Sequence, residues 1–204
     1  MPSHGPFPLP ALVLAAGASQ RMGRPKALLD SDGDTFVQLV VRTLAAASLS
    51  PVVVVTRAEL AAAIARDIRP ARVVVNPAPE LGQLSSLRAG FDAIDAIDAD
   101  AVLVTLVDLP MVRADTVAAL VNAWHDSHAP LVRPRVGATH GHPMIIRRDV
   151  IAALRDPLVD LAAGAKPIIR RVASREVTVD TDDEGTIADV DTPDDYLRLT
   201  SRKG

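Results

Sequence analysis

The alternation of short apolar runs with longer helical patterns is the feature of this sequence that most restricts its fold. Four runs rich in β-branched residues occur, at 12–16, 52–56, 72–76 and 101–107. Continuous apolar runs of this length are typical of strands buried in a parallel sheet. The segments between or after them carry apolar residues at helical spacing, at 36–48, 58–68, 86–97 and 115–127. The sequence therefore predicts a repeated βαβα order.

The pattern changes after about residue 128. Short strands are expected at 130–136 and 142–148, helices near 149–155 and 165–173, and a late strand at 176–180. We therefore predict an α/β fold: a Rossmann-like three-layer domain with a mostly parallel sheet and an antiparallel element in its C-terminal half.

The size and ends of the chain indicate one domain. The chain has 204 residues, of which 49% are hydrophobic, enough for one ordinary α/β core. We expect residues 1–10 to be a loose, Pro-rich lead-in and 11–204 to form the domain.

The N-terminal stretch lacks the basic start and apolar segment of a signal peptide, and no apolar run approaches membrane-spanning length. We expect a cytoplasmic protein without a membrane partner.

Composition excludes several functional classes. The chain has no cysteine, which excludes disulfides, thiolate metal sites and cysteine nucleophiles. Aromatic residues make up only 2% and the formal net charge is −3, so stacking platforms and a basic surface for nucleic acid are missing. A small anionic substrate remains compatible with this composition.

The segment from Leu14 to Lys26 has the composition of a phosphate-binding loop. It follows the first expected strand and contains two glycines, Arg21 and Lys26. Glycine lets a backbone turn and approach a ligand closely, and the free amides of such a loop point at anionic oxygens. Arginine can donate two hydrogen bonds at once to phosphate oxygens, and lysine adds a mobile point charge. An ordinary turn with two solvated cations is the plainer alternative.

This loop resembles a known signature. Neither GxxxxGK[ST] nor GxGxxG is present in it, whereas every fixed position of the pattern LAAGxSxRMGxPK is. That pattern belongs to the molybdenum-cofactor nucleotidyltransferase-like superfamily, and the resemblance extends from residue 12 to about 200. It implies nucleotide contacts from Leu14, Ala15, Ala16, Gly17, Ala18, Ser19, Arg21 and Lys26.

Two acidic segments are candidate metal sites. Asp108 follows the apolar run 101–107, at the strand edge where open α/β sheets bind ligands. Asp191 lies in the segment ADVDTPDD, where Thr192 or Asp191 could instead cap a helix beginning at Pro193. The family resemblance implies that Asp108 and Asp191 hold Mg²⁺, with Arg21, Lys26 and Asp108 as the catalytic residues.

The segment 80–90 is the candidate for base recognition. Gly82 permits a tight turn, and Gln83, Ser85 and Ser86 supply polar side chains beside a helix N-terminus. A plain serine N-cap is compatible with the same residues. The stretch is similar to the G-x-x-x-S-L-x-x-G segment of molybdenum-cofactor cytidylyltransferases more than to the G-P-L-A-G segment of the guanylyltransferases. The resemblance therefore implies CTP as the donor, with GTP as the alternative.

The second half carries the expected acceptor site. The segment THGHP at 139–143 resembles the family's G-H-P segment, which lies towards the acceptor, and this implies His140, His142 and Pro143 as acceptor residues. Either histidine could instead be an ordinary loop residue. The chain departs from the family at 161–166, where LAAGAK stands in place of a G-D-x-G-A-R-like element, and Lys166 cannot bind phosphate bidentately as arginine does. Molybdopterin is the leading acceptor, and another phosphorylated or hydroxylated small molecule is compatible.

The resulting hypothesis is a Mg²⁺-dependent transfer of a nucleoside monophosphate, with release of pyrophosphate. Its partners would be a nucleoside triphosphate and a small acceptor, together with a molybdoenzyme or chaperone that receives the product. Two rivals remain: an NAD(P)H-dependent oxidoreductase of a small heterocycle, and a nucleotide-binding module without catalysis. The missing GxGxxG disfavours the first, and the presence of Lys26, Asp108 and Asp191 disfavours the second.

Overall fold

The computed structural model describes residues 9–66, 68–94 and 99–201. The main strands are β1 (Ala11–Ala15), β4 (Val52–Thr56), β5 (Arg72–Val75), β6 (Ala101–Leu106), β7 (Leu131–Val136), β9 (Met144–Arg147) and β10 (Val177–Asp180). The α-helices are α1 (Phe36–Ala46), α2 (Ala58–Ala65), α3 (Gln83–Ile94), α4 (Ala114–Ser127), α5 (Arg148–Arg155), α6 (Lys166–Val172) and α7 (Pro193–Ser201). None of these helices is long and apolar enough to cross a membrane.

The sheet is mostly parallel. Its strand order in the described residues is β10-β7-β9-β6-β1-β4-β5, and the short β8 (Thr139–His140) pairs with β7. Strand β1 runs parallel to both β4 and β6, whereas β9 runs antiparallel to β6 and β7. The predicted fold class is therefore confirmed, including the antiparallel element in the C-terminal half.

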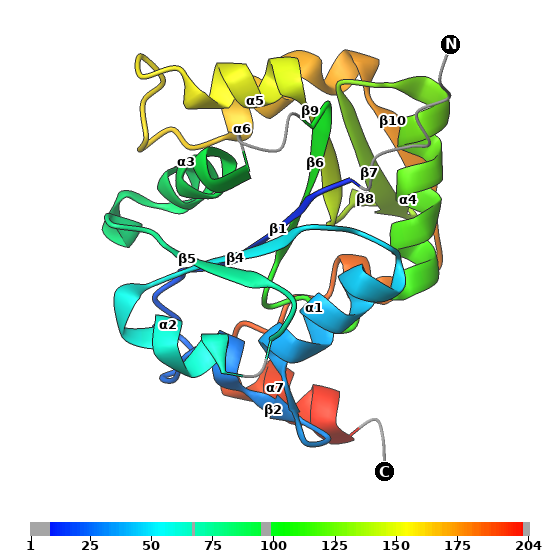
Figure 1. Cartoon of the computed structure of the whole chain (residues 1–204). Helices are drawn as coiled ribbons and strands as arrows, with labels where there is room; N and C mark the ends of the chain where they lie inside the picture. The colour runs from blue at the N-terminus through cyan, green and yellow to red at the C-terminus, as the bar shows by residue number, and fades with distance from the viewer. Residues whose placement is uncertain (1–8, 67, 95–98, 202–204) are drawn as a thin grey trace.

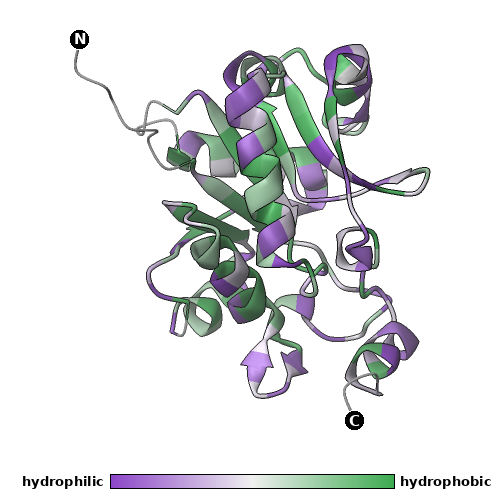
Figure 2. Ribbon diagram, turned by 90° about the vertical axis from the view of Figure 1, so that its right-hand side faces the viewer, coloured by the Kyte–Doolittle hydropathy of each residue, from purple (hydrophilic) through white to green (hydrophobic). Residues whose placement is uncertain are grey.

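Helices cover both faces of this sheet and make three layers (Figure 1). Side chains alternate along each strand because successive Cβ atoms point to opposite faces. In β1, Val13 packs into the core beneath α1, α2 and α4, whereas Leu12 and Leu14 pack into the core beneath α3, α5 and α6. Both faces of the central strands are thus apolar, as Figure 2 shows in the green strands between the helices.

Close packing fixes the position of α3 on the sheet. A Cβ atom built on Gly90 would lie 2.3 Å from Leu12 Cδ1, so a larger residue here would require the buried Leu12 side chain to move. The helix begins at Gln83, directly after Gly82 with a φ of +89°, which is earlier than the predicted start at 86. Its N-terminus is thereby held at the carboxyl edge of the sheet.

The start of the chain is only partly described. Residues 1–8 of the expected lead-in lie outside the described ranges. Leu9 and Pro10 are buried, and the Pro10 carbonyl accepts a hydrogen bond from Leu103 N at 3.0 Å. The Leu9 carbonyl accepts a hydrogen bond from Ser50 N at 3.1 Å, so the two residues before β1 are bonded to the segments on both sides of it.

Candidate active site

An open cavity of about 480 Å³ lies where β1 and β6 end. It is lined by Leu14, Ala15, Ala16, Gly17, Ala18, Ser19, Gln20, Arg21, Lys26, Ala27, Leu60, Pro79, Gly82, Gln83, Ser86, Leu106, Val107, Asp108 and Asp191. Segments far apart in the sequence therefore meet here: the loop after β1, the turn before α3, and the two segments that carry Asp108 and Asp191. Open α/β sheets bind ligands at this edge.

The loop after β1 is held by its own hydrogen bonds and one buried side chain. The Ser19 carbonyl accepts from Met22 N at 3.1 Å and Gly23 N at 3.0 Å, and Ser19 Oγ accepts from Lys26 N at 3.2 Å. Met22 is buried in the core, and Gly23 has a φ of +73°, which favours glycine. The loop is thus fixed at its far end, while Gly17 and Ala18 are exposed to the cavity.

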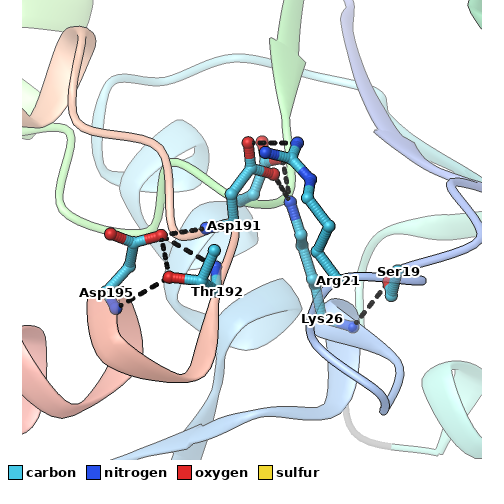
Figure 3. Close-up of polar contacts among 7 residues, drawn as sticks. Ser19, Arg21, Lys26, Asp191, Thr192 and Asp195 are labelled. Carbon is cyan, nitrogen blue, oxygen red and sulfur yellow. Dashed lines mark hydrogen bonds and ion pairs between the residues drawn. The ribbon is translucent and has the colours of Figure 1, made fainter.

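Lys26 lies between the two predicted metal ligands. Its Nζ donates to Asp108 Oδ2 at 2.8 Å and also to Asp191 Oδ1. Arg21 Nη2 donates to Asp191 Oδ2 at 2.6 Å, and Figure 3 shows Arg21 and Lys26 converging on Asp191. The side chain of Lys26 is only 13% exposed, compared with 69% for Arg21. Lys26 is therefore the cation held inside the site, and Arg21 is the one at its edge.

Backbone contacts bring the two acidic segments together. Val190 N donates to the Asp108 carbonyl at 2.9 Å, so the segment before α7 is bonded to the turn after β6. This bond is independent of the charged side chains. Asp108 and Asp191 consequently remain neighbours whether or not a cation lies between them.

The charges around Lys26 shift the pKa values of their partners. Desolvation is the largest single influence on Lys26 and lowers its pKa, but hydrogen bonds and charges from Asp108 and Asp191 together raise that pKa above its usual value. The hydrogen bond from Lys26 lowers the pKa of Asp191. Desolvation, followed by a contact with Asp191, raises the pKa of Asp189. Near neutral pH, Lys26 is charged and Asp191 is ionised.

At the start of α7, different residues cap the helix and face the cavity. Thr192 Oγ1 accepts from Asp195 N at 3.2 Å, and Asp195 Oδ2 accepts from Thr192 N at 2.8 Å, which is the reciprocal arrangement of a capping box. The same Asp195 oxygen accepts from Asp191 N at 3.1 Å. Thr192 and Asp195 thus cap the helix, and the Asp191 carboxylate remains directed at Lys26 and Arg21 (Figure 3).

Asn76 organises the expected base-recognition segment and was not identified from the sequence. It is buried at the end of β5, and its Nδ2 donates to Ser85 Oγ at 2.8 Å and Ser86 Oγ at 2.9 Å. Gln83 and Ser86 line the cavity, whereas Ser85 does not, since its hydroxyl donates to the Ala78 and Gly82 carbonyls. The Asn-Pro pair directly after a strand was the available signal for Asn76.

The three predicted acceptor residues lie outside the lining of the cavity. His140 is on β8, and its Nε2 lies 3.6 Å from Glu176 Oε1. Pro143 is buried against Thr105 and α1, where it contributes to packing. His142 is partly buried; burial lowers its pKa to about 4, although the charge of Asp108 opposes this shift. The imidazole of His142 is therefore neutral near pH 7.

The residues of this site can supply some, but not all, of the ligands of a hard divalent cation. Asp108 Oδ1 is buried and has no hydrogen-bond partner, and a carboxylate oxygen of this kind is a ligand that Mg²⁺ or Mn²⁺ prefers. Within the described residues, no group of three or more His, Cys, Asp or Glu side chains is arranged to hold a metal ion. Asp108 and Asp191 fit a cation whose remaining ligands come from water and substrate phosphates.

Comparisons with known proteins show which family and fold the chain shares. The chain is 36% identical over 196 residues to nicotine blue oxidoreductase of Paenarthrobacter nicotinovorans, covering 92% of this chain and 94% of that protein. It is 31% identical over 201 residues to molybdenum cofactor guanylyltransferase of Rhodobacter capsulatus, covering 94% of each chain. The structure of Mycobacterium tuberculosis Rv0371C in complex with manganese superposes with a TM-score of 0.73 at 25% identity, covering 96% of this chain and 99% of that one.

The family match settles the resemblance seen in the loop signature. Residues 11–177 match the MobA-like NTP transferase domain, which confirms the expected superfamily. The relatives carry different activities in their names, so the donor base and the acceptor are not given by the family. On the family match and the two relatives above, this chain belongs to the MobA-like NTP transferase family of nucleotidyltransferases.

Proposed function

We propose that this protein transfers a nucleoside monophosphate from a triphosphate to a small acceptor and releases pyrophosphate. The observation that carries this proposal is the convergence of Arg21, Lys26, Asp108 and Asp191 on one cavity behind a glycine-containing loop. Two cations and two carboxylates suit a polyphosphate together with a divalent cation, for which we favour Mg²⁺.

In the proposed reaction, an acceptor oxygen attacks the α-phosphorus in line. The new bond joins that oxygen to phosphorus, the bond from phosphorus to the bridging oxygen breaks, and pyrophosphate leaves with the electron pair. Lys26 and Arg21 would hold the phosphate oxygens on which charge accumulates. Asp108 and Asp191 would hold the cation, which supplies neutralisation of the triphosphate charge when bound.

The chemistry of the acceptor decides whether the reaction requires a general base. A phosphate nucleophile is already ionised at neutral pH, so no strong general base is required. His142 does not line the cavity, but its imidazole would be neutral near pH 7 and is influenced by the charge of Asp108. We propose a phosphorylated acceptor such as molybdopterin, bound toward His140 and His142, with a molybdoenzyme or chaperone as the later partner.

For the donor base we propose CTP, with GTP as the alternative. The similarity of residues 82–90 to the cytidylyltransferase segment supports CTP, whereas the guanylyltransferase named above supports GTP. In the cavity, Gln83 and Ser86 are the polar side chains of α3 available for a base edge or ribose.

The test is pyrophosphate release from each of the four triphosphates with Mg²⁺ and a phosphorylated pterin acceptor. Release that depends on both Mg²⁺ and acceptor supports the proposal. Binding of triphosphate without any release, across acceptors, would instead indicate a nucleotide-binding module.

A second candidate is reduction of a small heterocycle with NAD(P)H, favoured by the 36% identity to nicotine blue oxidoreductase. The loop that would hold the dinucleotide lacks GxGxxG, and the paired carboxylates have no role in hydride transfer. Loss of NADH absorbance with a heterocyclic dye, in the absence of Mg²⁺, would favour this candidate over nucleotidyl transfer.

A further inference from the structure

Lys26 occupies the position between the two carboxylates that a divalent cation would need. Its ammonium group engages Asp108 Oδ2 and Asp191 Oδ1, and Arg21 engages Asp191 Oδ2. Three of the four oxygens of these carboxylates therefore already accept from a cationic group. The fourth, Asp108 Oδ1, is buried and has no partner.

A cation arriving alone would meet an unfavourable site. It would find one free carboxylate oxygen, and the ammonium of Lys26 would lie within a few ångströms of it. Like charges at such separations repel each other strongly in a partly buried site. The described residues also offer no third carboxylate or histidine in metal-binding arrangement, so the protein alone does not complete the coordination.

A bound triphosphate would both draw Lys26 away from the carboxylates and complete the coordination of the cation. Its oxygens are stronger partners for Lys26 and Arg21 than the carboxylates they now contact, because the triphosphate carries several negative charges. It would also supply the missing oxygen ligands. Since Val190 N binds the Asp108 carbonyl, the two carboxylates would remain paired after Lys26 leaves them.

We propose that Lys26 is an internal counter-cation that keeps the divalent cation out of the site until a triphosphate binds. This inference rests on the proposed function. It assigns Lys26 two successive partners: Asp108 and Asp191 before nucleotide binding, and the triphosphate afterwards. Arg21, at 69% exposure, contributes less to this exclusion because solvent screens it.

The test measures retention of Mn²⁺ by the full-length protein in equilibrium dialysis, without nucleotide. The wild type is expected to retain little Mn²⁺, and Lys26→Met at least about tenfold more, because the repelling charge is gone and Asp108 Oδ2 and Asp191 Oδ1 are released. Lys26→Gln should behave like Lys26→Met. The double variant Lys26→Met, Asp108→Asn should lose the gain, and Arg170→Met, which removes an exposed cation of α6, should match the wild type.

A second arm adds α,β-methylene-CTP or α,β-methylene-GTP, which cannot release pyrophosphate. The wild type should then retain Mn²⁺ and nucleotide together. Melting temperature gives an independent reading: Mn²⁺ alone should raise it for Lys26→Met and leave that of the wild type unchanged.

The outcomes separate the two proposals. Tight Mn²⁺ binding by the nucleotide-free wild type, or equally weak binding by Lys26→Met and Lys26→Gln, overturns the role of Lys26 and leaves the proposed function standing. Retention of neither Mn²⁺ nor either analogue by the wild type overturns the proposed function and the inference with it.

Discussion

The Nζ atom of Lys26 lies 2.8 Å from Oδ2 of Asp108, although 82 positions separate these residues in the sequence. The contact joins the loop after β1 to the turn after β6, two neighbouring parallel strands. It places a predicted catalytic cation against a predicted metal ligand.

Lys26→Ala should lower turnover by about a hundredfold or more, because it removes a charge placed against the developing phosphate charge. The structure shows a side chain only 13% exposed, with two carboxylates as partners. The variant should therefore also lose about 1–2 kcal/mol of unfolding free energy.

Steady-state kinetics and urea denaturation check both effects of Lys26→Ala. The matched control is Arg42→Ala, which removes one partner of an exposed ion pair with Asp34 and should change neither quantity appreciably. Wild-type turnover in Lys26→Ala would exclude Lys26 from catalysis.

Asp108→Asn should abolish Mg²⁺-dependent turnover while keeping the fold, because the amide retains the shape and loses the charge that holds a hard cation. The measurement is a Mg²⁺ titration of the rate, with circular dichroism to verify folding. Asp149→Asn, an exposed acidic residue of α5, serves as the control. The assignment fails if the Mg²⁺ titration of Asp108→Asn matches that of the wild type.

Asp191→Asn and Asp195→Ala should separate the two tasks of the segment before α7. Asp191→Asn should raise the Mg²⁺ concentration needed for half-maximal rate about tenfold or more, since Asp191 faces Lys26 and the cavity. Asp195→Ala should mainly lower the melting temperature, because it removes the carboxylate that caps α7. The reverse pattern would show that Asp191 is the structural residue.

Titration of all four triphosphates with Mg²⁺ should show CTP binding more tightly than GTP. Recognition of one base edge by a few hydrogen bonds contributes about 1–3 kcal/mol to the difference in binding free energy, or roughly ten- to a hundredfold in affinity. Isothermal titration calorimetry gives the four dissociation constants. Tighter binding of GTP would identify GTP rather than CTP as the donor, and the proposed nucleotidyl transfer would still stand.

His142 should make stability depend on pH below neutrality. Burial lowers its pKa from 6.5 to about 4, so between these values the unfolded chain binds a proton that the folded chain does not. Its contribution is fully present above pH 6.5 and is lost as the pH falls toward 4, by as much as about 3 kcal/mol. Urea denaturation of wild type and His142→Gln from pH 4 to pH 7 tests this; parallel curves would contradict it.

Local sequence patterns predicted the strands and helices well because each pattern reports on burial along a single element. The apolar run at 52–56 is β4, and the helical spacing at 115–127 is α4 within one residue. The start of α3 was predicted three residues late, because Gly82 ends the preceding turn and lets the helix begin at Gln83. The positive φ at Gly82 depends on the turn, which periodicity does not report.

The fold class, the family and the phosphate-site composition of residues 14–26 could be predicted from the sequence, because they depend on local periodicity and on residues adjacent in the chain. Three features could be recognised only in the folded chain: the contacts of Lys26 with Asp108 and Asp191, the capping of α7 by Thr192 and Asp195, and the orientation of Ser85 toward Asn76 rather than the cavity. Each of these depends on which strand ends become neighbours. That pairing follows from the order of strands in the sheet, and a spacing along the chain does not encode it.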